Sequence, residues 1–506
     1  MGRHGPWLAG VSTMSEGEYR FEPLQRTGLL LGLSAAQLGV VAGAVLVAFA
    51  SVRALPGARG WAVATVALVA AGGACKQVMG RSPLDWARLG SSFLMRPKRA
   101  VVAPPAAGAT VPSSNTLPRD ALAGGPPRST PGYRGAPGQK GKTYLGPIEP
   151  CLILPSKTFA SGVYLGQACV DAGGPVGVLV DERFGTVAAL LRARGGPFCL
   201  LDRPAKELRQ AAWAGALESF SNQLSGLVRL QWCHRALPVR LEAPASEEGT
   251  AGESWRCWRH ETFLVVVVRG LARRRLGAVA GRHEVPREVA FVLGKEVAGL
   301  RAQLHAIGTA CDGPLDARGC ARAIGASLVA GLERHPRAHP WPLATSERWG
   351  EVQADGYWHR VYWVAEWPRS GVGPDFLSPL LVARAQRCFS VVMAPVPPER
   401  AARDAESSRT AQLADAKLRA QGGFLETARQ RRQAEAVEGR EVHLAEGRGA
   451  YRFAGYVAVS ARAKGDLERS CGELERAAGS ARLCLRPLYG QQKEALSWAL
   501  PFGRGV

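Results

Sequence analysis

The sequence predicts an α+β protein with three parts: an N-terminal two-helix transmembrane hairpin, a disordered linker and a cytoplasmic αβ region with ferredoxin-like layers. Three observations predict this class. Thr27–Val52 contains no charged residue, and a second apolar run spans Trp61–Cys75. Val101–Gly146 is rich in Pro, Gly, Ala, Ser and Thr and poor in large apolar residues, so it cannot offset the entropy of ordering. From Ile148 onward, β-branched runs alternate with amphipathic stretches of helical length.

The first apolar run is long enough to cross a bilayer, since a span takes about 20 apolar residues. The run is too long and begins too late for a signal peptide, and a second run follows it closely. Six Lys and Arg residues lie within 76–99, whereas the turn between the runs holds only Arg53 and Arg59. Positive charge marks the cytoplasmic side, so we expect a multi-pass protein of the inner membrane with both termini cytoplasmic. Met14 is an alternative start of the chain.

The net charge of +22 indicates either an anionic partner or a solvated, arginine-rich surface beside a membrane. Inner-membrane lipids are the expected anionic partner, and direct nucleic-acid binding stays open. Ten of the eleven cysteines lie beyond the second apolar run. In the expected topology they face the reducing cytoplasm, so buried thiols are expected rather than disulfides.

We divide the chain into five parts. These are a cytoplasmic tail (1–28), the hairpin with its basic flank (29–95), the linker (96–147), an αβ domain (148–340) and a second αβ domain with a long charged helix (341–506). In the first domain we expect strands over 162–180, 187–192, 227–237 and 262–268, and helices over 203–224, 285–307 and 315–332. In the second we expect strands over 357–367, 388–394, 451–460 and 481–485, and helices over 397–446 and 464–478.

The order strand, helix, strand, helix, strand in the second domain suggests a ferredoxin-like layer. Its long charged stretch lacks a sustained apolar heptad. We therefore expect a solvated helix, interrupted at Gly422-Gly423, rather than a coiled-coil arm. No internal repeat is evident in the sequence.

Two motifs suggest chemistry, and both fail on geometry. Ala136–Thr143 satisfies a relaxed phosphate-loop pattern, but linker sequence precedes it and Pro147 blocks a following helix. Cys233-His234 and Cys257–His260 offer four metal ligands, but neighbouring strand residues point to opposite faces. We therefore expect no cofactor, no metal, no catalytic residue and no enzyme activity.

The C-terminal run Leu483–Gly503 (LCLRPLYGQQ, then ALSWALPFG) resembles the join between the N-terminal domain and the RecA-like motor in the conjugation ATPases of type IV secretion. Val228–Trp232 and Trp349–Trp367 also match that N-terminal domain. The two-helix anchor, preceded by Tyr19–Pro23, resembles the small PrgI-like inner-membrane subunit of these systems. The whole order is similar to an actinobacterial family of PrgI-like integral membrane proteins. The anchor and cytoplasmic region also resemble EccE of type VII secretion.

The resemblance implies a membrane-anchored, non-motor scaffold subunit of a type IV-like conjugation or secretion apparatus. Only Arg504, Gly505 and Val506 follow the run, so the implied partners are a separate motor ATPase and other membrane secretion subunits. Because aromatic side chains dominate interfaces, Tyr489, Trp498 and Phe502 are the candidate partner-binding residues. The alternative is that these three close the domain's own core. Two other functions stay open: an EccE-like component of type VII secretion, and a membrane-tethered enzyme with an unrecognised Cys or His site.

Overall fold

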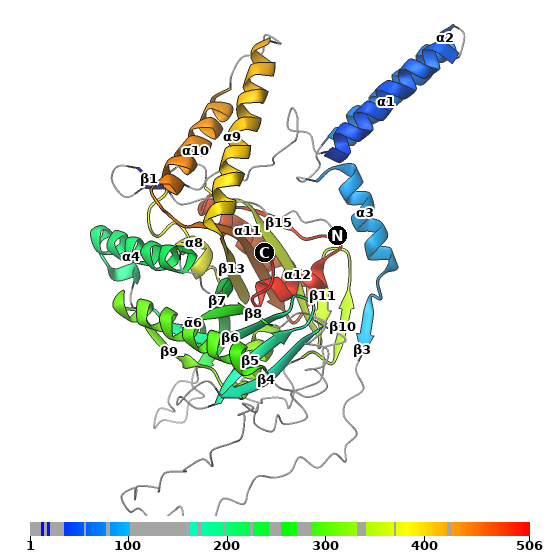
Figure 1. Cartoon of the computed structure of the whole chain (residues 1–506). Coiled ribbons are helices and arrows are strands. Elements are labelled where there is room, and N and C mark those ends of the chain that lie inside the picture. Colours follow the sequence, from blue (N-terminus) through cyan, green and yellow to red (C-terminus); the bar gives the residue numbers. More distant parts are fainter. Residues whose placement is uncertain are drawn as a thin grey trace, which may run out of the picture.

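The computed structural model describes residues 12–14, 18–20, 35–54, 57–76, 81–101, 159, 162–169, 175–196, 198–222, 226–241, 255–270, 285–330, 341–368, 371–421 and 427–506. These residues form a mixed α+β structure around one large antiparallel sheet (Figure 1), which confirms the α+β class. The phosphate-loop pattern Ala136–Thr143 and most of the expected linker lie outside the described residues.

The large sheet contains 13 strands in the described part of the chain. They are β3 (Arg99–Val101), β4 (Val163–Cys169), β5 (Pro175–Asp181), β6 (Thr186–Arg194), β7 (Leu227–Leu241), β8 (Trp255–Arg269), β9 (Ala310–Pro314), β10 (Ala344–Glu347), β11 (Val352–Ala354), β12 (Tyr357–Glu366), β13 (Arg387–Val396), β14 (Ala450–Ala461) and β15 (Cys484–Pro487). A separate two-stranded ribbon pairs β1 (Ser12–Met14) with β2 (Glu18–Arg20).

The helices of the described residues are α1 (Ala35–Ala54), α2 (Ala58–Cys75), α3 (Pro83–Met95), α4 (Arg203–Asn222), α6 (Arg287–Ala306), α7 (Ala317–Leu328), α8 (Ser378–Val382), α9 (Pro398–Gln421), α10 (Ala428–Ala445), α11 (Lys464–Ser480) and α12 (Gln492–Ala499), with a 3₁₀ turn at Phe198–Leu200. In the αβ region α4, α6, α7 and α11 lie close to predicted helices, α9 and α10 share the segment predicted as one long helix, and α8 and α12 were not predicted. The predicted strand 481–485 is displaced to β15, because Arg482 adopts a φ of 57° in a turn that follows α11.

The order of elements repeats along the chain, although the sequence shows no repeat. A first unit runs β4, β5, β6, α4, β7, β8, α6, β9, α7, and a second runs β10, β11, β12, α8, β13, β14, α11, β15, α12, with two further helices, α9 and α10, inserted between β13 and β14. The pairing repeats as well. The start of β6 pairs with β5 and its end with β9, and β12 divides itself in the same way between β11 and β15.

The two units meet where β7 pairs antiparallel with β13, with Cys233 opposite Ser390 at the centre of the register. Because equivalent strands meet antiparallel, the sheet has an approximate internal two-fold axis at this point. The domain boundary expected at residue 340 falls between the units, but the sheet continues across it. Whether 148–340 and 341–506 are independent domains stays a prediction.

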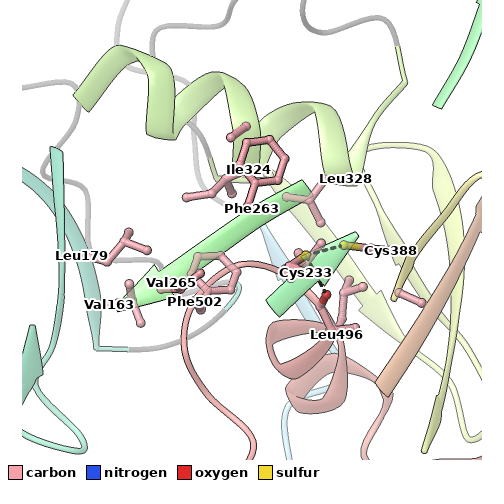
Figure 2. Close-up of a cluster of buried hydrophobic side chains, with 14 of the residues drawn as sticks. Val163, Leu179, Cys233, Phe263, Val265, Ile324, Leu328, Cys388, Leu496 and Phe502 are labelled. Atoms are coloured by element: carbon pink, nitrogen blue, oxygen red, sulfur yellow. Dashed lines mark hydrogen bonds between the residues drawn. The ribbon is translucent and has the colours of Figure 1, made fainter. Parts of the chain in front are cut away.

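Each face of the sheet carries its own set of helices. On one face α4 and α6 cover the first unit, and α8 and α11 cover the second. On the other face α7, α12 and the end of the chain share one core with strands of both units, as Figure 2 shows. Strand β8 lies between these layers: Phe263 and Val265 point to one and Leu264 and Val266 to the other. Burial on both sides explains its continuous apolar run.

The apolar helices α1 and α2 lie side by side and extend away from the domain (Figure 1). Among the described residues, Gln37–Ala54 is long and apolar enough to cross a membrane, and Ala58–Ala74 forms a shorter apolar helix. Length and composition alone are weak evidence for a span. That the two helices form a transmembrane hairpin therefore stays a prediction.

One part of the expected linker 96–147 is structured, which corrects that boundary. Arg99–Val101 form the edge strand β3, which pairs with Ala344–Ser346 of β10. Composition did not reveal it, because strand pairing uses backbone donors and acceptors that every non-proline residue carries.

The charged stretch after β13 forms two helices, α9 and α10, which lie against each other and project from the sheet as an arm (Figure 1). As predicted, the first helix ends just before Gly422-Gly423, a pair outside the described residues. Ala405 and Val437 are buried in the arm, and Arg409 pairs with Glu441. Small side chains thus let two charged helices pack without an apolar heptad.

Candidate functional site: the C-terminal tail and the α3 joint

The C-terminal tail (residues 488–506) is held by two fully buried glutamines. Gln231 of β7 donates from Nε2 to the carbonyl oxygens of Trp498, at 3.1 Å, and Leu500, at 2.9 Å. Its Oε1 accepts from the backbone nitrogen of Gly503 at 2.7 Å. The side chain thus uses all its donors and one acceptor position on a segment about 270 residues away in sequence.

Gln492, at the start of α12, joins the other end of the tail to β12. Its Oε1 accepts from the backbone nitrogen of Val361 at 2.7 Å, and its Nε2 donates to the Val361 oxygen at 3.2 Å and the Leu488 oxygen at 3.0 Å. An unpaired buried amide costs about 1–3 kcal/mol. Gln231 and Gln492 therefore satisfy backbone groups that the sheet leaves without strand partners.

Phe502 lies in the core, with 4% of its surface exposed. Its ring stacks on Trp341 at a centroid distance of 5.7 Å and packs against Phe159 at 5.9 Å. Figure 2 places it beside Val265. In this structure Phe502 closes the protein's own core, which is the alternative stated above for the three aromatic residues.

Trp498 is half-buried and packs on the Tyr456 ring, with 5.3 Å between centroids. Its carbonyl oxygen also accepts from Ser390 Oγ at 2.8 Å. Its indole therefore keeps some exposed surface while its backbone is fixed.

Tyr489 belongs to an aromatic cluster that joins α3 to the domain. We call the side chains of Trp86, Leu89, Phe93, Trp349 and Tyr489 the α3 joint. Tyr489 lies nearly parallel to Trp349, with centroids 6.4 Å apart, and Trp86 lies 6.3 Å from Tyr489. Phe93 meets Trp349 edge-on at 5.2 Å, and Leu89 lies near Gly490, which has a φ of 68°. Tyr489 thus binds another part of its own chain.

Polar contacts surround the α3 joint. Arg96 lies 3.9 Å from a carboxylate oxygen of Glu494, and the Glu347 backbone nitrogen donates to the Lys98 oxygen at 2.8 Å. Together with the β3–β10 pairing, these contacts attach the whole segment 81–101 to the domain.

Sequence reasoning missed α3, although two signals for it were present. Ser82 and Asp85 form a capping box around Pro83, which is a typical helix start. Trp86, Leu89 and Phe93 then follow at intervals of three and four, the spacing of one apolar helix face. Gln231 has a weaker signal, since it is an amide between the apolar residues Leu230 and Trp232. Gln492 has none, because its neighbours are polar.

The three segments that resemble the conjugation ATPases come together in space. Val228–Trp232 contributes Gln231 to the tail, and Trp349–Trp367 contributes Trp349 to the α3 joint and β12 to the pairing with β15. The tail contacts both. The segments on which that expectation rests thus form one contiguous structure rather than three scattered sites.

The cysteine and histidine motifs do not converge. Cys233 Sγ lies 3.2 Å from Cys388 Sγ in the core shared by both units, while His234 points to the opposite face and its Nε2 lies 3.2 Å from His260 Nδ1. The hydrogen bond with Cys388 and burial both raise the pKa of Cys233, so Cys233 stays a protonated thiol. Burial, with Arg387 and His260 nearby, lowers the pKa of His234 to about 3. Among the described residues, no three His, Cys, Asp or Glu side chains are grouped to hold a metal ion.

No protein-family model matches this chain, and a search of the curated proteins finds no similar sequence.

Proposed function

We propose that the protein is a membrane-anchored, non-motor scaffold subunit of a type IV-like conjugation or secretion apparatus, which docks a separate motor ATPase at the inner membrane. The observation that carries the proposal is the α3 joint. It fixes the segment that follows the apolar helices onto the α+β domain, next to the tail. A domain attached in this way stays close to the bilayer, so docking to a membrane-bound assembly becomes effectively intramolecular.

The finer fold assignment belongs to the same proposal. Apart from α9 and α10, which are inserted in the second unit, the elements of each unit run strand, helix, strand, strand, helix, strand. The sheet order is β9-β6-β8-β7 in the first and β15-β12-β14-β13 in the second. Both central strands lie between antiparallel neighbours. This order supports two ferredoxin-like layers joined edge to edge.

Reporter fusions test the anchor. A reporter fused after Pro97 should give a cytoplasmic signal, and one fused after Gly57 should give a periplasmic signal. The Lys and Arg residues of 76–99 keep the segment that follows the second apolar helix on the cytoplasmic side. A periplasmic signal from the Pro97 fusion would contradict the topology.

Docking is tested by purification from the native membrane in mild detergent, with identification of any bound ATPase. The full-length protein should retain the motor encoded beside it, and Trp498→Ala should weaken that retention if this half-exposed indole contacts the partner. Phe502 is unsuitable for this test, since its removal would open the core. A Trp498→Ala variant that retains the motor as wild type does would remove Trp498 from the docking surface.

The scaffold role also predicts that the purified protein does not hydrolyse ATP. Lys142→Ala should leave any residual rate unchanged, because linker sequence and Pro147 flank the phosphate-loop pattern. ATP hydrolysis that disappears in this variant would replace the scaffold proposal with a motor.

A further inference from the structure

Three arginines surround one aromatic ring beside the tail. Phe184, in the turn between β5 and β6, is 49% exposed. The guanidinium carbons of Arg183, Arg229 and Arg504 lie 5.5, 5.4 and 5.6 Å from its ring centroid. We call these four residues and Asp181 the arginine corner. It joins the first unit of the sheet to the end of the chain.

Both carboxylate oxygens of Asp181 already bind other groups. Its Oδ2 lies 2.5 Å from Nε of Arg504, and its Oδ1 accepts from the backbone nitrogens of Arg183 at 3.0 Å and Phe184 at 3.3 Å. Arg183 itself pairs with Glu494 at 2.9 Å. The two carboxylates therefore have partners, and neither lies within ion-pair distance of Arg229.

Arg229 is a buried cation that forms no ion pair with a carboxylate of the described residues. Its side chain is 4% exposed, and no hydrogen-bond partner reaches its Nε within the described structure. Burial lowers its pKa, Asp181 opposes that shift and Arg504 adds to it. An unpaired buried charge is costly, because guanidinium groups stay protonated and lose hydration without compensation.

Local structure directs Arg229 into this position. The register between β7 and β8 shifts between Leu227 and Arg229, so one residue of β7 is passed over and Arg229 takes the place opposite Val267. Val267 lies in the core layer that contains the tail. From Arg229 onward the register is regular, so Arg229 lies on the same face as Gln231 and Cys233, which is the face of the tail.

We propose that the arginine corner binds a carboxylate from an acidic segment of a partner protein. Arg229 is the buried anchor, Arg183 is the rim contact and the exposed Phe184 ring packs on the incoming chain. Carboxylates are the groups that Arg504 and Arg183 already bind, through Asp181 and Glu494. Arginine and aromatic side chains are also enriched among the residues that contribute most of the binding energy at protein interfaces. The inference rests on charge balance, so it holds whether or not the partner is a motor ATPase.

The experiment uses full-length protein in detergent and a fluorescein-labelled peptide of six glutamates, followed by fluorescence anisotropy. Because a net charge of +22 attracts any acidic peptide, the control is Arg462→Met, which removes the same charge from an exposed position. Arg229→Met should weaken binding at least about tenfold, as expected for a charge-assisted hydrogen bond. Arg462→Met should change it less than about twofold, since exposed charges contribute little.

Thermal unfolding separates a binding role from a structural one. Arg229→Met removes an unpaired buried charge, so its unfolding midpoint without peptide should equal or exceed that of wild type. A lower midpoint would show that Arg229 serves the fold, and equal losses of binding in the two variants would show attraction by net charge alone. Inorganic phosphate at matched ionic strength should compete poorly. If phosphate displaces the peptide at equal concentration, the site binds a free anion and the partner assignment is wrong.

Discussion

At the scale of single residues, buried polar side chains determine the position of the C-terminal tail in the fold. Gln231 and Gln492 are each completely buried, and each makes three hydrogen bonds to backbone groups. Aliphatic residues at these places would fill the same volume. They would also leave the backbone nitrogens of Gly503 and Val361 unpaired, so the two glutamines specify one position for the tail.

Gln231→Leu should lower the free energy of unfolding by about 1–3 kcal/mol, because the backbone nitrogen of Gly503 loses its partner in a buried position. The Trp498 and Leu500 oxygens keep other donors, Ser390 Oγ and the Phe502 nitrogen. Denaturant titration of the purified protein measures the change. Gln353→Leu, at a half-buried position on β11, is the control and should stay within about 1 kcal/mol of wild type. A Gln231 variant as stable as the control would show that other contacts suffice to hold the tail.

His359 of β12 predicts a loss of stability in acid. It is completely buried with Nδ1 2.8 Å from Ser460 Oγ, and burial lowers its pKa to about 3. The unfolded chain takes up this proton near pH 6.5, whereas the folded chain does not until about pH 3. Stability is therefore complete above pH 6.5 and falls between pH 6.5 and 3 by about 1.4 kcal/mol per pH unit.

Thermal unfolding at pH 7 and pH 5 checks this. His359→Asn should be less stable than wild type at pH 7 but should lose about 2 kcal/mol less on going to pH 5. His305→Asn, at an exposed position, should keep the full pH dependence. If both variants respond to pH as wild type does, His359 does not control the acid response.

At the scale of elements, α3 converts two apolar helices and a domain into one connected structure. Its apolar face packs on Trp349 and Tyr489, and β3 follows it onto the sheet edge. A fragment starting at Ile148 would lack both elements and would expose the aromatic surface of the α3 joint. The anchor segment thus contributes to the domain that it anchors.

Trp349→Ala should release α3 from the domain. Trp349 contacts Trp86, Phe93 and Tyr489, so its removal should cost about 1.5–3 kcal/mol of local stability, less than for a full core position. Limited trypsin digestion should cut after Arg88 at least about tenfold faster than in wild type. Trypsin cleaves the form in which α3 has left the domain, and the population of that form depends on the local free energy of opening.

Trp213→Ala is the control for this digestion. Trp213 is a half-buried residue of α4 that packs on the core of the first unit, away from the α3 joint, so cleavage after Arg88 should keep the wild-type rate. Equal rates in wild type and the Trp349 variant would mean that the aromatic cluster does not hold α3.

At the scale of the whole molecule, the duplicated sheet makes each half dependent on the other. Paired strands β7 and β13 lie in the middle, and Cys233, Cys388 and Val392 belong to a core that includes α7 and α12. Cutting at residue 340 would uncover the edge of β13 along Arg387–Met393. An uncovered, apolar edge strand tends to pair with another copy.

Residues 341–506 expressed alone should therefore not form a stable monomer. Size-exclusion chromatography with light scattering should detect dimers or larger species, and co-expression with residues 81–340 should restore a 1:1 complex. A monomeric fragment 341–506 with cooperative thermal unfolding would instead establish the two independent domains expected from the sequence.

The sequence by itself determined most elements of the αβ region and its α+β class. Hydrophobic period and β-branched runs are local signals, so α6, β12 and β14 lie within a few residues of their predicted places. Strand β8 begins at Trp255, before the apolar run that predicted it. The geometric argument against joining Cys233 to His234 holds. Only the tertiary structure decided the sheet order, the duplication, the α3 joint and the burial of Phe502. These depend on which distant segments meet, as when Gln231 reaches Gly503 or Tyr489 reaches Trp86, and residue spacing along the chain carries no record of such contacts.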